Sequence, residues 1–210
     1  MINWPKNNMI NMNIRPVMEG DLPDIIKIHV SSFKEFFLSS LGDDFLKIYY
    51  NAYIKNPNAL LLCIEDDSRN VVGFAAAAID SVGFNKKLIL HSPLAFLFIS
   101  IKLMLSKPRA LFRLLKNFTK RSETIEDNGD YAELFSIAVS PNQQGKGIGK
   151  LLLSASEDYI RTKKIAKMSL TTDYYNNDKT IRFYKAMGYH ELYEFIAYPN
   201  RKMYRFIKEL

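Results

Sequence analysis

Apolar residues recur along the first third of the chain with two periods, and these periods predict its first elements. Residues 12–17 have the alternation of a strand, and Asp21 is suited to cap a helix. Apolar positions at helical spacing follow twice, at 22–33 and at 45–53, with the sequence SSLGDD between them. The pattern therefore predicts two amphipathic helices, the second ending at Asn56, before a proline.

The rest of the chain alternates between strand-like and helix-like stretches. Strands are expected at 59–65 and 71–80 as a hairpin around DDSRN, at 133–139, and as a last pair at 189–197 and 202–208, with a helix at 148–161. The predicted order is strand, two helices, two strands, a long insert, strand, helix, strand, helix and two strands. We expect one domain over 12–210, preceded by a flexible lead-in at 1–11 without a secretory signal.

The insert, residues 84–122, carries the most apolar run in the chain, LILHSPLAFLFISIKLML, followed by a basic stretch. His91, Pro93 and Lys102 interrupt the run too often for a membrane span of about 20 residues. Further on, one helical face gathers the apolar residues and another the basic ones. The apolar positions are Leu111, Leu114, Leu115 and Phe118, and the basic ones are Arg109, Arg113, Lys116 and Lys120. We expect helices that cover one side of the sheet, form a dimer contact or lie on an anionic membrane.

A glycine-spaced turn lies between the strand predicted at 133–139 and the helix predicted at 148–161. Gly145, Gly147 and Gly149 allow left-handed backbone angles and a close approach to a ligand, and N–H groups at the start of a helix attract phosphate. The spacing is not that of a dinucleotide-binding fingerprint, and no G-K-[ST] of a P-loop is present. By itself the turn is also compatible with a plain connection between strand and helix.

Two ordered motifs carry a family resemblance. The sequence QGKGIG, residues 144–149, resembles the Q/R-x-x-G-x-G/A motif of the GNAT N-acetyltransferase superfamily. The sequence NDKTIRFYKAMGY, residues 177–189, resembles that family's N-x-x-A-x-x-F-Y-x-x-x-G-F/Y segment, with Thr180 where alanine is usual. The resemblance implies an α/β fold with a mixed, mostly antiparallel central sheet flanked by helices, and a helical basic insert between strands 3 and 4.

The resemblance also implies a site for acetyl-CoA. The strand before the turn would offer backbone groups to the pantetheine arm, the turn would hold the pyrophosphate with help from lysine charges, and an asparagine would fix the arm. The residues implied are Ile137, Ala138, Val139, Gln144, Gly145, Lys146, Gly147, Ile148, Gly149, Lys150 and Asn177.

Acetyl transfer to an amine needs a base for the amine and an acid for the departing thiolate. The resemblance places Tyr184 as the general acid, although a tyrosine at an apolar helical position is also a common core residue. Glu133 is the candidate base, because burial beside an apolar strand would raise the pKa of its carboxyl group. A solvated residue at the sheet edge is the alternative for Glu133.

Composition bears on the size of the domain and on the chance of a disulfide or a metal site. The chain has 210 residues, 48% of them hydrophobic, which suits one domain with a sizeable core. The single cysteine, Cys63, excludes an internal disulfide and favours the cytoplasm; it sits in a strand-like run and is expected to be buried. His29, His91 and His190 lack metal-ligand spacing, so no metal is expected.

Charge speaks against a nucleic-acid partner. The net charge is +7, but residues 81–122 alone carry nine Lys or Arg and no Asp or Glu, so the remainder is close to neutral. The acceptor is expected to be a primary amine of a small molecule, for instance an amino sugar of surface-polysaccharide synthesis, with Phe33, Phe36, Phe37, Tyr49 and Tyr50 near it or in the core. Protein or peptide amines, and a non-catalytic acetyl-CoA sensor, stay open as alternatives.

Overall fold

A computed structural model describes residues 12–34, 37–119 and 127–210. The lead-in predicted at 1–11, Phe36, and the last residues of the predicted insert, 120–122, lie outside the described residues. Side chains at 114, 115 and 117–119 lie outside them as well, so the predicted apolar stripe of the insert is described only at Leu111.

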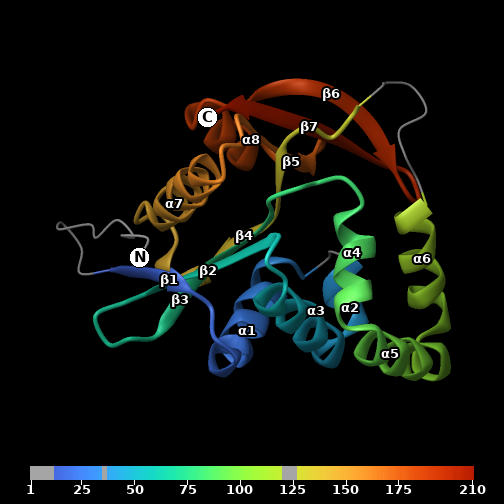
Figure 1. The fold of residues 1–210 in the computed structure, drawn as a ribbon. Helices are drawn as coiled ribbons and strands as arrows, with labels where there is room; N and C mark the ends of the chain where they lie inside the picture. Colours follow the sequence, from blue (N-terminus) through green and yellow to red (C-terminus); the bar gives the residue numbers. More distant parts are fainter. Residues whose placement is uncertain (1–11, 35–36, 120–126) are drawn as a thin grey trace.

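A seven-stranded sheet in the order β1-β2-β3-β4-β5-β7-β6 forms the centre of the protein (Figure 1). Every neighbouring pair is antiparallel except β4 and β5, which are parallel, so the mixed and mostly antiparallel sheet predicted from the sequence is confirmed. The strands are β1 (Asn13–Pro16), β2 (Ala59–Glu65), β3 (Val71–Ala78), β4 (Ala132–Val139), β5 (Lys167–Asp173), β6 (His190–Ala197) and β7 (Arg201–Glu209).

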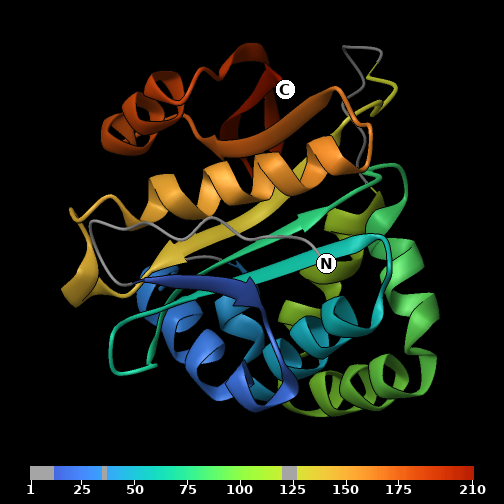
Figure 2. The ribbon, with the colours of Figure 1, turned by 60° about the vertical axis from the view of Figure 1, so that its left-hand side comes forward.

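Helices cover both faces of the sheet (Figures 1 and 2). On one face lie α1 (Leu22–Ser32), α2 (Phe37–Leu41) and α3 (Asp43–Lys55), which pack apolar side chains onto β2, β3 and β4. On the other face lie α7 (Ile148–Thr162) and α8 (Asp178–Ala186), whose core includes Leu134, Leu152 and Leu170. The helices α1, α3 and α7 bury most of the stripe that their 3.6-residue period predicts.

The segment between the first two predicted helices differs from the prediction of a simple break. It holds the short helix α2, and Gly42 then separates α2 from α3 with φ of +94°. Because a left-handed backbone angle costs a side chain about 1–2 kcal/mol, glycine is the residue that allows this reversal. Propensity alone does not predict a five-residue helix, which forms here because it packs against its neighbours.

Three helices lie between β3 and β4, where the basic insert was expected: α4 (Phe84–His91), α5 (Pro93–Ser106) and α6 (Pro108–Thr119). They begin on the α3 side of the sheet, and α6 reaches the end of the β6–β7 hairpin (Figure 1), where the Lys116 amine lies 5.3 Å from the centre of the Tyr198 ring. Among the described residues no single helix is long and apolar enough to cross a membrane; α4 and α5 meet that length and composition test only as a pair bent by 99°.

Candidate functional site

The parallel strands β4 and β5 pair over only three residues. Ala132, Glu133 and Leu134 are in register with Met168, Ser169 and Leu170, and beyond them β4 pairs with β3 alone while β5 pairs with β7 alone. The two strands therefore separate at the carboxyl end of β4. This gap opens between the helices that cover the two faces of the sheet, and the glycine turn lies at its end.

The backbone of β4 faces this gap with N–H and C=O groups that do not bond to β3. The N–H of Ser140 donates to the carbonyl oxygen of Val72 at 2.8 Å, which fixes the phase of the β3–β4 ladder. Alternation then turns the N–H and C=O groups of Ile137 and Val139 away from β3 and toward the gap. The backbone groups of Ala138 instead bond to β3. Of the three strand residues predicted to bind the pantetheine arm, Ala138 is therefore the one whose main-chain groups do not face the gap.

The glycine turn has the conformation that its sequence predicts. Gly145 and Gly147 have φ of +81° and +79°, and a Cβ atom on either would meet no protein atom within 4 Å. The first hydrogen bond of α7 runs from Leu151 N–H to Gly147 O at 3.1 Å, so the N–H groups of Ile148, Gly149 and Lys150 precede it. An open space faced by helix-start N–H groups is suited to an anionic phosphate.

Side chains of the turn have different tasks. The Gln144 amide donates to the carbonyl oxygen of Val139 at 3.3 Å, which ties the turn to the end of β4. The Lys146 amine donates to Gln143 Oε1 at 2.7 Å and remains exposed, as does Lys150. The Ile148 side chain is buried, so only its backbone is available to a ligand. A Cβ atom built on Gly149 would lie 3.7 Å from the Phe183 ring. Glycine at this position therefore lets α7 and α8 come close together.

Asn177 stands at the start of α8 and links it to the end of β5. Its amide nitrogen donates to Thr172 Oγ1 at 2.6 Å and to the carbonyl oxygen of Asp173 at 3.0 Å. These bonds hold α8 beside the gap. The amide group is thereby fixed at the place where the resemblance puts a contact to the pantetheine arm.

Tyr184 lies on the α7–α8 side of the gap, buried in the same apolar core as Leu134 and Leu170. Its ring is 5.2 Å from that of Phe183 and 5.9 Å from that of Tyr189. Burial raises the pKa of the Tyr184 hydroxyl above its ordinary value. The hydroxyl therefore keeps its proton near neutral pH, as a proton donor must.

Glu133 projects from the opposite face of the sheet. Its neighbours in sequence, Ala132 and Leu134, belong to the core under α7, so alternation points the carboxylate toward α3. The side chain is 13% exposed, and Arg205 Nη1 lies 3.1 Å from Glu133 Oε1. Burial raises the pKa of the Glu133 carboxyl group, and the charge of Arg205 partly opposes this increase. The alternative of a solvated edge residue is therefore wrong.

Arg205, on β7, is the centre of a small polar cluster that sequence reasoning did not identify. Besides Glu133 it contacts Ser169 Oγ on β5 at 3.1 Å and Asp127 Oδ2, before β4, at 3.5 Å. Asp127 accepts hydrogen bonds from the hydroxyl groups of Tyr131 and Tyr193. Burial raises the pKa of Asp127, but these bonds and the N–H of Gly129 outweigh it and leave the pKa below its ordinary value.

Only the tertiary structure brings this cluster together, because 72 residues separate Glu133 from Arg205. The one signal in the local sequence is that Arg205 lies between two aromatic residues of a predicted strand. The cluster fixes the Glu133 carboxylate in orientation and holds a positive charge beside it.

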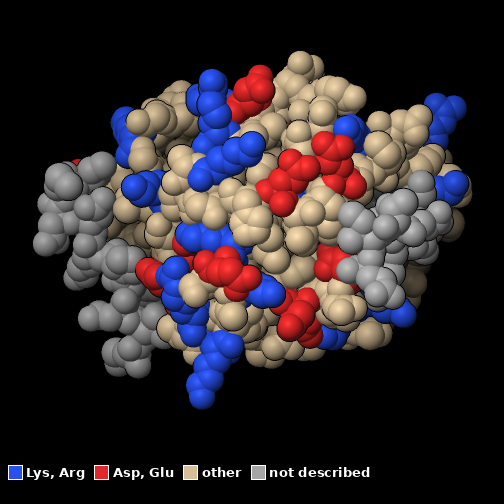
Figure 3. Space-filling model, turned by 90° about the horizontal axis from the view of Figure 1, so that it is seen from above, with Lys and Arg blue, Asp and Glu red and all other residues tan. Residues whose placement is uncertain are grey.

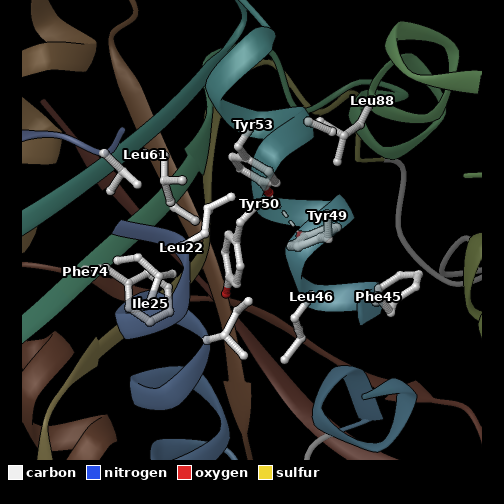
Figure 4. Packing of buried hydrophobic residues seen from close by; sticks show 14 of the residues in the cluster. Leu22, Ile25, Phe45, Leu46, Tyr49, Tyr50, Tyr53, Leu61, Phe74 and Leu88 are labelled. Atoms are coloured by element: carbon white, nitrogen blue, oxygen red, sulfur yellow. Dashed lines mark hydrogen bonds between the residues drawn. The ribbon is translucent and has the colours of Figure 1, made fainter. Parts of the chain in front are cut away.

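The aromatic residues of the predicted acceptor region divide between core and cavity. Tyr50 is fully buried in the core, whereas Tyr49 and Phe37 line a cavity beneath α4 and α5. Figure 4 shows Tyr49, Tyr50 and Tyr53 projecting from α3, with the hydroxyl groups of Tyr49 and Tyr53 joined at 3.1 Å. Phe33 is half-buried at the end of α1 and packs on His29.

The remaining titratable residues have structural surroundings. Cys63 is buried, as expected, and burial raises the pKa of its thiol to about 12. His29 is buried among aromatic rings, while His91 and His190 are exposed. Within the described ranges, no three His, Cys, Asp or Glu side chains come close enough together to hold a metal ion.

Two comparisons place this architecture. The family model of the acetyltransferase (GNAT) family matches residues 22–189. The chain therefore belongs to the GNAT acetyltransferase family, and it is an acyl-CoA-dependent N-acyltransferase whose family uses acetyl-CoA to acetylate amines. The prediction made from residues 144–149 and 177–189 is confirmed at the level of the family. No curated protein matches the chain.

Solved structures show the same fold at low sequence identity. The ribosomal-protein-S18-alanine N-acetyltransferase of Escherichia coli has 15% identity and a TM-score of 0.59, covering 94% of this chain and 93% of its own. A spermidine N-acetyltransferase chimera from Vibrio cholerae and hSSAT has 19% identity and a TM-score of 0.60, covering 94% and 95%. A putative acetyltransferase of the GNAT family from Desulfovibrio desulfuricans has 15% identity and a TM-score of 0.61, covering 94% and 98%.

Proposed function

We propose that the protein transfers the acetyl group of acetyl-CoA to a primary amine of a small molecule, with the gap between β4 and β5 as the reaction site. The observation that supports this proposal is that β4 and β5 stop pairing after Leu134. Beyond this point the backbone groups of Ile137 and Val139 turn toward the space proposed for the pantetheine arm, although the Val139 carbonyl oxygen already accepts from the Gln144 amide and from Ser32 Oγ. The gap leads to the glycine turn, whose open space would take the pyrophosphate.

The chemistry is divided between the two faces of the sheet. Glu133, on the α3 face, takes a proton from the ammonium group of the acceptor, directly or through water, and so frees its lone pair. The amine then forms a bond to the thioester carbonyl carbon, and the carbon–sulfur bond breaks. Tyr184, on the α7–α8 face, donates its proton to the departing thiolate. The nitrogen loses its second proton to water as the amide forms, and Tyr184 regains a proton from water.

Conservative substitutions test these roles. Tyr184→Phe is expected to lower kcat by at least about tenfold, while the Kd of acetyl-CoA changes little, because the hydroxyl acts as the thiolate leaves. Glu133→Gln is expected to lower kcat/KM for the amine. The matched control is Tyr189→Phe, which removes a hydroxyl from the same aromatic cluster.

The assay is release of free thiol from acetyl-CoA, run against amino sugars, polyamines, simple amines and peptides. Equal losses of turnover and acetyl-CoA affinity in Tyr184→Phe would contradict the acid role. Acetyl-CoA binding without thiol release for any acceptor would instead favour the sensor. Acetylation of peptides alone would move the acceptor class from small molecules to protein amines. An amino sugar and a cytoplasmic location stay predictions.

We further propose that the outer surface of α4, α5 and α6 contacts an anionic membrane. Leu94 and Leu105 are 79% and 81% exposed, and five more large apolar side chains of α4 and α5 are exposed around them. The charges of the insert itself are basic, since residues 81–122 contain no Asp or Glu, although Lys87 and Lys102 pair with Asp80 and Asp44. A symmetric dimer through this surface would oppose like charges, whereas an anionic lipid surface complements them.

The face that carries α7, α8 and the last strands has a different charge pattern. Figure 3 shows basic and acidic side chains interspersed over this face, without a single basic groove.

Sedimentation with phosphatidylglycerol and phosphatidylcholine vesicles tests the membrane proposal, with Leu94→Gln/Leu105→Gln as the variant. We expect binding to anionic vesicles only, weakened in the variant. A dimer in sedimentation velocity that the variant dissociates would refute it.

A further inference from the structure

A cavity of about 440 Å³ lies between the insert helices, α2, α3 and β4, and we call it the insert pocket. Its volume is in the range of small-molecule sites, about 300–1,000 Å³. The residues that line it are Phe37, Leu38, Phe45, Tyr49, Asn85, Leu88, Ile89, Pro93, Phe96, Leu97, Ser100, Leu111 and Phe135.

The insert pocket connects the surface with the interior. Leu97, on its wall, is 58% exposed, whereas Phe45 and Leu88 are 3% and 1% exposed. A ligand therefore has a way in from solvent, and its inner end would be surrounded by side chains. Figure 4 shows Phe45 and Tyr49 projecting from α3 and Leu88 projecting from α4.

The inner end of the insert pocket adjoins the proposed base. Phe135 lies two residues after Glu133 on β4, on the same face of the sheet, and stacks on Phe84 of α4 at 5.4 Å. A shift in register opposite Ala76 and Ala77 leaves Phe135 without a partner on β3, so this residue forms a bulge. Tyr49 is close enough to Glu133 for the carboxylate to raise the pKa of the Tyr49 hydroxyl, after the larger effect of burial.

The lining is almost entirely apolar. None of the described residues that line the pocket is charged, and the polar side chains among them are those of Tyr49, Asn85 and Ser100. The Tyr49 hydroxyl already bonds to that of Tyr53. A sugar ring placed here would lose water from its hydroxyl groups and find few partners, at a cost for each unpaired group. An alkyl or aryl group would be stabilised by burial.

We infer that the insert pocket holds an apolar part of the acceptor, and that the acceptor is a primary amine with an alkyl or aryl group of several carbons. This inference rests on the proposed function, because it places the amine next to Glu133. The pocket lies on the Glu133 face of the sheet, whereas the glycine turn, α8 and Tyr184 form the cofactor side. The occupant is therefore the acceptor and not a long acyl chain of the donor.

Unbranched primary amines from propylamine to octylamine test the inference, with acetyl-CoA as donor. We expect kcat/KM to rise by about fourfold for each added methylene until the pocket is filled, the factor that corresponds to burial of one methylene. Ser100→Phe places a ring in the pocket and should abolish this rise, with acetyl-CoA affinity unchanged. Ser106→Phe, an exposed position on the same helix, should keep the rise.

The outcomes separate the inference from the proposed function. Acetylation of amines with no dependence on chain length, or the same dependence in Ser100→Phe, overturns the inference and leaves the function. A preference that follows the acyl length of the donor, from acetyl-CoA to octanoyl-CoA, also overturns it. If no amine is acetylated, the proposed function fails. Ligand-observed NMR with unreactive 1-octanol then tests the apolar pocket by itself. Binding of 1-octanol to the parent and not to Ser100→Phe supports the apolar assignment, and equal signals for both proteins refute it.

Discussion

His29, in α1, makes the stability of this protein depend on pH in a way that can be calculated. Its ring lies among Phe33, Tyr50 and Phe74, with ring centres 4.9, 5.7 and 6.3 Å away. His29 Nδ1 and the Tyr50 hydroxyl oxygen are 2.6 Å apart, and Nε2 has no partner among the described residues. A second proton would therefore bring an unpaired charge into the core. Burial lowers the pKa of His29 from its ordinary value of 6.5 to about 4.

The magnitude follows from proton binding to the unfolded chain. Above pH 6.5 neither state binds the proton, and the contribution of neutral His29 to stability is fully present. As pH falls from 6.5 to 4, only the unfolded state takes up the proton, so each pH unit lowers the free energy of unfolding by about 1.4 kcal/mol. The loss attributable to His29 is about 2 kcal/mol at pH 5 and about 3 kcal/mol at pH 4.

The assay is urea unfolding at pH 7.5 and pH 5, for the parent and for His29→Gln. Carboxylates titrate in both proteins, so the prediction concerns the difference: His29→Gln should lose about 2 kcal/mol less than the parent between the two pH values. His91→Gln, at an exposed histidine, is the control and should behave as the parent. The same pH dependence in the parent and in His29→Gln would refute the assignment of a buried neutral histidine.

Two further predictions concern the cofactor turn and the proposed base. Gly147→Val should cost about 1–2 kcal/mol of stability and abolish acetyl-CoA binding in calorimetry, because its side chain enters the open space beside the turn. Gly83→Val, also at a left-handed helix start with open space, should carry the cost without the binding loss, and unaffected binding in Gly147→Val would disprove the pyrophosphate assignment. Arg205→Gln removes the charge that lowers the pKa of Glu133, so the acid limb of kcat/KM should move to higher pH. An unmoved limb, or an equal shift in Arg201→Gln, would exclude Glu133 as the titrating base.

The local elements could be predicted because their causes are local. The stripe at 148–161 is the buried face of α7, and the two apolar runs on either side of the turn at 66–70 form the β2–β3 hairpin. Gly147 has the left-handed backbone angle that its place between strand and helix predicts. Two motifs in the last third of the chain were enough to predict the family, because their glycines, asparagine and tyrosine are tied to one backbone shape. The short helix α2 was missed because five residues do not show a period.

The environment of the site was decided by contacts between distant segments. The pairing of β4 with β5 over three residues, which opens the gap, depends on where β3 pairs with β4 and β7 pairs with β5. The sequence proposed Glu133 as a base but left its burial and its partner undetermined, since Arg205 lies on another strand. The apolar insert pocket likewise forms only where α2, α3 and the insert helices meet β4. Residue type and spacing determine which secondary structures form, while solvent exclusion and charge at the site are properties of the assembled chain.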